Sequence, residues 1–388
     1  MSGWARRPTT WWISVRGSSP LPSSADFLRR ALLLAARGRY RTSPNPMVGA
    51  VVVHEGEIVG RGWHRQVGGP HAEVEALRVA GQKARGATMY VTLEPCNHQG
   101  RTPPCVDAVL AAGIARVVAC HRDPNRVAAG GFERLAAAGV EVEHGVLAEE
   151  AVRLNLRFLV PAVLGRPEVT LKWAMSLDGR IATATGQSQW ISSPAGRRWG
   201  LALREEHDAI LAGIGTVLAD DPRLDRRLGL AGKPNLRVVL DRRLRTPPGA
   251  RLFQVEGPVL IYTESADRER RTALEERGAT VVDLPMVEPG AVLADLFDRG
   301  VRSVLVEGGG EVHASFASAG LFDRVGVDCA PLLIGGRSAP GPLGGEGFPT
   351  LAGAARLESL EVRRRGGDLI LTGYRNGCLR ELSSSVGA

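Results

Sequence analysis

The residues best suited to chemistry are His71, Glu73, Cys96 and Cys105, with Glu94-Pro95 directly before the first cysteine. One imidazole and two thiolates make a three-ligand zinc site whose fourth position stays open to water, as catalytic zinc requires. Zinc lowers the pKa of its bound water toward neutrality, so hydroxide becomes available to attack an amidine-like carbon. Glu73, two residues after the histidine, can stand beside the metal and shuttle protons. The set therefore predicts a zinc-dependent hydrolytic deaminase.

The spacing of the two cysteines departs from the usual zinc-deaminase signature. That signature reads H-x-E followed by P-C-x-x-C, whereas eight residues separate Cys96 from Cys105. Two alternatives are a buried histidine with two inert core thiols, and a binding module stabilised by zinc. Structural zinc normally has four protein ligands, which favours catalysis. Cys120, Cys329 and Cys378 have no such neighbours and are expected to be packing thiols.

The composition is that of a folded chain with more than one core. Its 388 residues predict two or three domains. Hydrophobic residues make up 44% and charged residues 23%, which excludes a disordered chain. No apolar run approaches the roughly 18 residues of a membrane span. The net charge of +8 is spread along the chain as arginine pairs. This charge indicates either a solvated arginine-rich surface or an anionic partner, which would be a phosphorylated small molecule or nucleic acid.

The chain is expected to carry an extension, two domains and a tail. Residues 1–23 are read as a disordered extension, because the apolar stretch is too short for a signal peptide and Arg16 interrupts it, so a cytoplasmic location is expected. The zinc signature predicts a deaminase domain over 24–163. A Gly-Pro linker follows, a second domain covers 167–375, and 376–388 form a tail.

Helices and strands alternate in both domains, which predicts an α/β fold and, in the second domain, a largely parallel sheet with helices on both faces. In the first domain we expect a helix capped by Ser24, strands at 47–53, 58–63 and 87–93, a helix at 71–80, helix–strand units at 104–120 and 131–144, and a helix near 147–159. In the second we expect strands at 169–174, 208–213, 236–240, 258–262, 279–283 and 302–306, helices at 194–206, 267–277, 291–299 and 310–319, and two final strands within 356–372.

Two glycine-rich segments lie in the second domain, at 213–215 and 308–310. Backbone N–H groups and a helix N-terminus after the second segment could cradle a pyrophosphate. Neither segment completes G-x-G-x-x-G, because Leu218 and His313 occupy the place of the third glycine. The alternative to a pyrophosphate site is that the glycines only make a tight connection between strand and helix.

Three segments of the first domain closely resemble the bifunctional deaminase/reductase family of riboflavin biosynthesis: 44–49 (PNPMVG), the zinc signature, and 92–105 (TLEPCNHQGRTPPC). The longer cysteine spacing is normal in that family. Segments 172–182, 187–192, 213–222 and 307–310 resemble its reductase half, so the likeness covers about 24–374. It implies a cytidine-deaminase-like three-layer domain followed by a dihydrofolate-reductase-like α/β domain that uses NADPH.

The resemblance also implies two sequential reactions. Zinc hydroxide removes the 2-amino group of 2,5-diamino-6-(ribosylamino)-pyrimidin-4-one 5′-phosphate, with Glu73 relaying protons. NADPH then reduces the ribosyl group of 5-amino-6-(5-phosphoribosylamino)uracil to ribityl. Phosphorylated pyrimidines are thus the expected partners, with no nucleic acid and no membrane, and the chain is expected to form a homo-oligomer, either a dimer or a tetramer.

The resemblance assigns further residues by position. Contacts to the deaminase substrate fall on Asn45, His64, His98, Arg101 and Thr102, with Arg101 at the phosphate. The cofactor site falls on Ala174, Trp190, Thr216, Asp220, Arg242, Gly309, Gly310, Glu311, Val312, His313, Ala314 and Ser315. The reductase substrate falls on Ser188, Arg204, Leu224, Arg227 and Glu307.

Several of these positions have a simpler structural interpretation. Asn45 could be a turn former between two prolines. Arg204 and Arg227 are suited to clamp a phosphate, but each could be an ordinary surface arginine. Asp220 could assist protonation, orient the cofactor or cap a helix end. Arg242 stands where relatives have serine, so its pairing with the 2′-phosphate of NADPH is an open alternative.

The main competing function is a nucleic-acid (tRNA) deaminase with a fused accessory domain. The scattered positive charge permits it. Aromatic residues are only 5% of the chain, too few for a base-stacking surface, and the loop between the cysteines carries donors suited to a phosphate. These features favour the small-molecule substrate.

Overall fold

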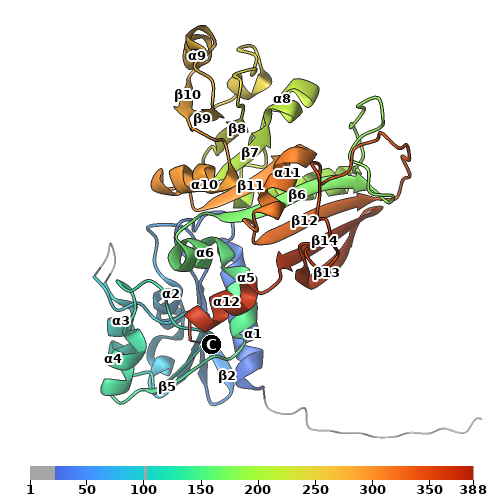
Figure 1. Ribbon diagram of the computed structural model, residues 1–388. Coiled ribbons are helices and arrows are strands. Elements are labelled where there is room, and N and C mark those ends of the chain that lie inside the picture. Colours follow the sequence, from blue (N-terminus) through green and yellow to red (C-terminus); the bar gives the residue numbers. More distant parts are fainter. Residues whose placement is uncertain (1–21, 100–102, 388) are drawn as a thin grey trace, which may run out of the picture.

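The computed structural model describes residues 22–99 and 103–387. They form two lobes, each built on its own β-sheet, with the chain passing from one to the other near residue 165 (Figure 1). Within the described part of the chain, no helix combines the length and apolar character needed to cross a membrane.

The first lobe is a three-layer α/β/α structure around a five-stranded sheet of order β2-β1-β3-β4-β5. One face packs α1 and α5, and the other packs α2, α3 and α4. The strands are β1 (Gly49–His54), β2 (Glu57–Trp63), β3 (Thr88–Val91), β4 (Arg116–Ala119) and β5 (Glu141–His144). The helices are α1 (Ser24–Ala35), α2 (Ala72–Ala80), α3 (Cys105–Ala111), α4 (Gly131–Ala137), α5 (Ala148–Leu154) and α6 (Leu156–Leu164), with short 3-10 turns η1 (Ala36–Gly38) and η2 (Gly81–Ala84).

The first helix shows how local sequence sets an element. Ser23, rather than the expected Ser24, caps α1: its hydroxyl accepts from the Asp26 N–H, and the Asp26 carboxylate accepts from the Ser23 N–H. This reciprocal pair is a capping box. Phe27, Leu28 and Ala31 then recur at helical spacing and bury against the sheet.

The second lobe contains a nine-stranded sheet of order β10-β9-β8-β7-β11-β6-β12-β14-β13. It is parallel from β10 to β12 and antiparallel in β14 and β13, which confirms the largely parallel sheet. The strands are β6 (Glu168–Ser176), β7 (Ala209–Gly213), β8 (Leu236–Leu240), β9 (Val259–Thr263), β10 (Ala279–Asp283), β11 (Ser303–Gly308), β12 (Arg324–Ala330), β13 (Leu357–Arg365) and β14 (Asp368–Arg375).

Helices cover both faces of this sheet, as expected. Residues of α10 and α11 pack on one face, and residues of α8 and α9 pack on the other. The helices are α7 (Pro194–Glu206), α8 (Ile214–Asp220), α9 (Arg268–Glu275), α10 (Pro289–Asp298), α11 (Gly310–Ser318) and α12 (Cys378–Ser385), with a 3-10 turn η3 (Arg251–Phe253).

Several elements differ from the sequence expectation. Helix α8 and strand β12 were not expected, and residues 378–385 form α12 instead of a tail. The single helix expected near 147–159 is divided at Asn155 into α5 and α6. Strand β12 contains a glycine and an aspartate, and it is held by pairing with β6 on one side and β14 on the other. Helix α12 buries Cys378, Leu379 and Leu382 against α5 and α6, so the end of the chain returns to the first lobe (Figure 1).

Polar contacts also join the lobes. The Ser43 hydroxyl donates to the Asp208 carboxylate at 3.0 Å, and Arg41 Nε donates to the Leu230 carbonyl oxygen at 3.2 Å. The segment around residues 41–43 of the first lobe is therefore fixed against the second lobe.

Candidate active sites

The predicted metal ligands meet at one point of the first lobe. His71 is the residue before α2, Cys105 is the first residue of α3, and Cys96 lies in the loop after β3. His71 Nδ1 lies 3.1 Å from Cys105 Sγ and 3.5 Å from Cys96 Sγ. One imidazole nitrogen and two thiol sulfurs within 4.8 Å of one another fit a zinc ion with an open fourth position.

Glu73 lies beside these ligands in a buried setting. Its side chain is almost fully buried, and its Oε2 has no hydrogen-bond partner among the described residues. Burial raises the pKa of Glu73 to about 6. A carboxyl group with such a pKa can both accept and donate a proton near neutral pH, as a proton relay requires.

The thiols and the imidazole are electrostatically coupled. The Cys105–Cys96 hydrogen bond lowers the pKa of Cys96 and raises that of Cys105, because one proton is shared between the two sulfurs. The Cys96 thiolate also raises the pKa of His71. A proton-sharing pair of this kind gives up its proton when a cation replaces it.

Close packing of α2 on β2 positions His71 and Glu73. A Cβ added at Gly62 would lie 2.2 Å from the Ala72 carbonyl oxygen and 2.5 Å from the Ala76 nitrogen. Only glycine permits this approach, so the start of α2 is held directly over the strand.

Glu94 fixes the loop that carries Cys96. Its buried carboxylate accepts hydrogen bonds from the backbone N–H groups of Asp123, Gly130 and Phe132, at 3.0, 3.1 and 3.0 Å. This anchoring role was not foreseen, and only the position of Glu94 beside Pro95-Cys96 could have suggested it.

Two of the expected substrate contacts lie next to the zinc ligands. Asn45 Nδ2 lies 3.2 Å from His64 Nε2, and the His64 ring meets the His71 ring edge-on at 5.4 Å between centroids. Asn45 also closes a turn, since its N–H donates to the Thr42 carbonyl oxygen, and its contact with the substrate stays a prediction. His98 lies in the loop after Cys96, whereas Arg101 and Thr102 lie outside the described residues.

In the second lobe, Arg204 and Glu307 form a tight pair. Arg204 Nε lies 3.0 Å from each Glu307 carboxylate oxygen, and both side chains are largely buried, which rules out a surface arginine. Burial favours a high pKa for Glu307, but Arg204 and Lys172 outweigh it and lower this pKa. Lys172, which received no role from the sequence, also lies near Gly200, at 3.3 Å from the position of a Cβ there.

Arg227, Ser188 and Asp220 are held by further polar contacts. Arg227 Nε pairs with the Asp225 carboxylate at 3.0 Å, and this arginine is about 40% exposed. The Ser188 hydroxyl donates to Asp220 at 2.7 Å, and Asp220 is the last residue of α8. Leu224 is buried close by with a positive φ of 49°.

The glycine-rich turn after β11 is closely packed. A Cβ at Gly308 would lie 2.8 Å from Thr216 Oγ1, and Gly309 has a φ of +79°, so neither position accepts a side chain easily. Helix α11 begins at Gly310, which directs its free N–H groups to this turn. This cradle fits the pyrophosphate of a dinucleotide.

Other expected cofactor residues differ in their exposure. The His313 side chain is buried, with its ring nitrogens 3.2 Å from the carbonyl oxygens of Pro342 and Val306, and Val312 packs on Gly213. Trp190 is largely exposed, with Arg197 over its ring. Arg242 is also exposed and pairs with Glu264 at 3.3 Å. Ala174 is half-buried on β6, and Glu311, Ala314 and Ser315 lie on α11.

Comparison with known protein families agrees with this two-lobe arrangement. Residues 22–121 match the cytidine and deoxycytidylate deaminase zinc-binding region, and residues 167–371 match the RibD C-terminal domain. The chain belongs to the RibD family. The riboflavin biosynthesis protein RibD of Aquifex aeolicus is 42% identical over 347 residues, covering 89% of this chain and 97% of that protein. RibD of Bacillus amyloliquefaciens is 44% identical over 352 residues, covering 89% and 95%.

Solved RibD structures share the whole architecture. The Acinetobacter baumannii RibD structure has a TM-score of 0.80 at 37% identity, covering 91% of this chain and 99% of that one. A Thermotoga maritima structure described as a diaminohydroxyphosphoribosylaminopyrimidine deaminase/5-amino-6-(5-phosphoribosylamino)uracil reductase has a TM-score of 0.79 at 35% identity, covering 91% and 98%. The RibD likeness therefore includes both lobes and their connection.

Proposed function

We propose that this chain is a bifunctional riboflavin-biosynthesis enzyme. Its first lobe deaminates 2,5-diamino-6-(ribosylamino)-pyrimidin-4-one 5′-phosphate, and its second lobe reduces the ribosyl group of the resulting 5-amino-6-(5-phosphoribosylamino)uracil to ribityl. The observation that carries the proposal is the convergence of His71, Cys96 and Cys105 beside the buried Glu73. Membership of the RibD family supports the pairing of this site with a reductase.

In the deaminase lobe, His71, Cys96 and Cys105 would hold zinc, which would supply a Lewis acid that makes water nucleophilic at neutral pH. Glu73 takes the proton of the attacking water and passes it to the leaving amine, for which its partner-free oxygen is placed. Asn45, His64, His98, Arg101 and Thr102 contact the substrate, with Arg101 at its phosphate.

In the reductase lobe, bound NADPH would supply the hydride for C1′ of the substrate, while the protein supplies position and charge. Gly309 and Gly310 of the turn and the start of α11 would hold the cofactor, together with Ala174, Trp190, Thr216, Asp220 and Arg242. Ser188, Leu224, Arg227 and the Arg204–Glu307 pair form the substrate side. Because the Arg204 guanidinium grips a carboxylate, we assign it to fixing Glu307 and Arg227 to the phosphate.

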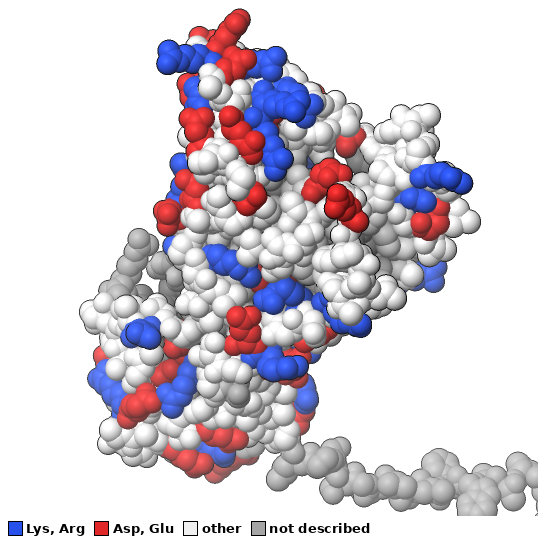
Figure 2. Space-filling model, viewed as in Figure 1, with Lys and Arg blue, Asp and Glu red and all other residues white. Residues whose placement is uncertain are grey.

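The nucleic-acid alternative is not favoured. Relatives named as riboflavin biosynthesis proteins match about nine-tenths of the chain. On the face seen in Figure 2, acidic and basic side chains are interspersed and form no continuous basic stripe. Phosphorylated pyrimidines are therefore the proposed partners, in a cytoplasmic homo-oligomer, either a dimer or a tetramer.

One assay tests both halves of the proposal. The zinc-loaded enzyme receives the diaminopyrimidinone phosphate with and without NADPH, while ammonia and NADPH absorbance are followed together. We expect ammonia in both reactions and NADPH consumption only after ammonia release begins. A chelator should stop ammonia release yet leave reduction of the deaminated intermediate unchanged. Ammonia release that persists after zinc has been removed would contradict the proposal.

A further inference from the structure

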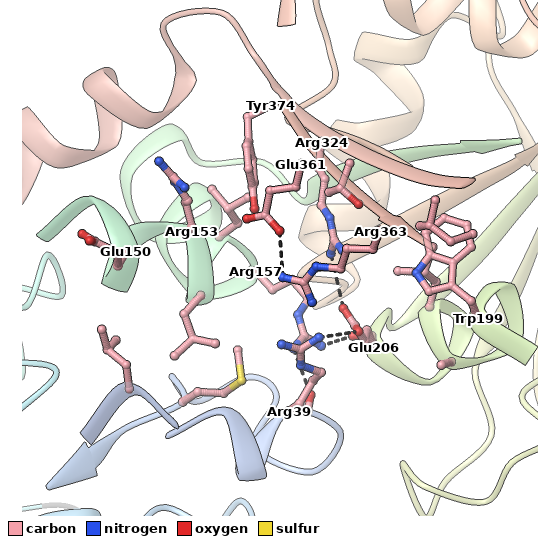
Figure 3. A pocket seen from close by; sticks show the side chains of 18 of the residues that line it. Arg39, Glu150, Arg153, Arg157, Trp199, Glu206, Arg324, Glu361, Arg363 and Tyr374 are labelled. Carbon is pink, nitrogen blue, oxygen red and sulfur yellow. Dashed lines mark hydrogen bonds and ion pairs between the residues drawn. The ribbon is translucent and has the colours of Figure 1, made fainter. Parts of the chain in front are cut away.

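A cavity of about 670 Å³ lies where the two lobes meet, outside both candidate active sites (Figure 3). Residues of α1, α5 and α6 line it from the first lobe, and residues of α7, β12, β13 and β14 line it from the second. Its volume is within the roughly 300–1,000 Å³ of small-molecule sites. Its lining includes seven arginines and four glutamates, so positive charge is in excess.

Two guanidinium groups pair with one carboxylate in this cavity, and a third lies against the backbone beside it. Arg39 Nη1 lies 3.2 Å from Glu206 Oε1, and Arg324 Nη1 lies 3.4 Å from Glu206 Oε2 (Figure 3). Arg157 donates to the backbone carbonyl oxygens of Arg39, at 2.9 Å, and of Glu206. Glu168, another acid of the lining, accepts from Thr170 through Oε1, and its Oε2 lies 3.4 Å from His207 Nε2. Glu206 therefore pairs with two arginines, whereas Arg157 contacts only backbone oxygens.

The surplus charge includes donors without an acceptor. Within residues 22–99 and 103–387, no ion pair includes Arg157. The Nε atoms of Arg324 and Arg153 are buried and have no hydrogen-bond partner in that same part of the chain. Leaving a buried charged donor unpaired is costly, whereas a phosphate group accepts several such donors at once.

The rest of the wall is apolar and aromatic. Trp199 and Leu203 of α7, Ile370 and Tyr374 of β14, and Tyr40 line the same cavity. Flat aromatic side chains beside aliphatic ones accommodate a planar ring. The lining thus combines an anion-binding end with a surface for a heterocycle.

We propose that this cavity binds an organic phosphate monoester that carries a planar ring, as a third site of the enzyme. It is separate from the reductase site because Trp199, Ala202, Leu203 and Glu206 share one face of α7 at spacings of three, four and seven residues. Arg204 points instead to Glu307. A ligand there touches both lobes and bridges them.

Titration calorimetry of the zinc-loaded full chain with uridine 5′-monophosphate tests the site. We expect Arg324→Met to weaken binding at least about 10-fold, the size expected for one lost charge-assisted contact. Arg101→Met and Arg227→Met remove the proposed phosphate contacts of the two catalytic sites and serve as matched controls. Each control should keep the cavity's binding isotherm. Inorganic phosphate should bind at least about 10-fold more weakly than the nucleotide, since it lacks the ring.

Circular dichroism and a melting curve verify the fold of each variant. If Arg324→Met does not fold, Arg365→Met takes its place, because Arg365 lines the cavity at an exposed position. Wild-type affinity in a folded cavity variant, or loss of all binding in either control variant, would overturn the proposal. Equal affinity for inorganic phosphate and the nucleotide would overturn the assignment to an organic phosphate.

Discussion

At the level of single side chains, Glu73 combines burial, a raised pKa and an oxygen without a partner, beside three potential zinc ligands. A structural carboxylate would be expected to use both oxygens, as Glu94 does with three backbone donors. Glu73 therefore has an oxygen available for proton transfer, whereas both oxygens of Glu94 are used to fix a loop.

We predict that Glu73→Gln lowers ammonia release by about 10²–10⁴-fold, because the amide cannot relay protons. Reduction of the deaminated intermediate by NADPH should be unchanged, and zinc content should stay at the wild-type value because Gln leaves all three ligands in place. Ammonia and NADPH assays on the purified variant, with metal analysis, measure these quantities. Loss of both activities in a folded, zinc-containing variant would show that the two sites do not act separately.

Arg204 is the corresponding residue of the second lobe. We predict that Arg204→Met destabilises the protein by about 3–5 kcal/mol, because Glu307 loses its closest counter-charge while it stays buried. Reductase kcat/KM should fall while ammonia release is kept. Arg227→Met is the control for stability: this arginine is about 40% exposed, so a change within about 1 kcal/mol is expected. Urea unfolding of both variants measures how much the buried Arg204–Glu307 pair contributes to the free energy of unfolding.

At the level of elements, the distance between α2 and β2 sets the geometry of the metal site. Helix α2 follows His71 and carries Glu73, and glycine at position 62 lets its first turn touch the strand. A metal centre tolerates little displacement of its ligands, so this packing acts on function as well as on stability.

We predict that Gly62→Ala destabilises the protein by about 1–3 kcal/mol and weakens zinc binding, because the new methyl group pushes the start of α2 off the strand. Gly249→Ala is the matched control, since a Cβ there has open space and the backbone needs no positive φ. Thermal unfolding and zinc titration compare the two variants. Wild-type zinc affinity in Gly62→Ala would show that the close approach does not position the ligands.

At the level of the whole molecule, the lobes are held together by charge as well as by chain connection. Burial favours a high pKa for Glu206, but Arg324, Arg39 and Arg157 outweigh it and lower this pKa to about 2. A carboxyl group with a depressed pKa stabilises the folded state above its ordinary pKa of 4.5 and loses this effect as the pH falls toward 2.

We predict that Glu206→Gln costs about 3 kcal/mol of unfolding free energy at pH 7, and that the difference from wild type shrinks between pH 4.5 and pH 2. Denaturant unfolding of the variant and the wild type at several pH values measures this difference in unfolding free energy. Glu346→Gln alters an exposed side chain and should stay within about 0.5 kcal/mol of wild type throughout. A Glu206→Gln difference that does not vary with pH would contradict the role of its charge.

The zinc ligands, the neighbouring acid and the alternation of helices and strands could be predicted from the sequence. These features are local: a short run of residues fixes the order and type of the ligands, and hydrophobic periodicity fixes most elements. The pairing of Arg204 with Glu307 could not be predicted, because 103 positions separate them and an arginine suits phosphate and carboxylate equally.

Only the tertiary structure shows that residues 378–385 form a helix and that Arg39, Arg157 and Arg324 contact Glu206. Helix α12 gains its stability by burying three residues against the first lobe. Glu206 and the three arginines each come from a different part of the fold. Such contacts depend on how two lobes pack, and the sequence pattern along one segment carries no record of its partner.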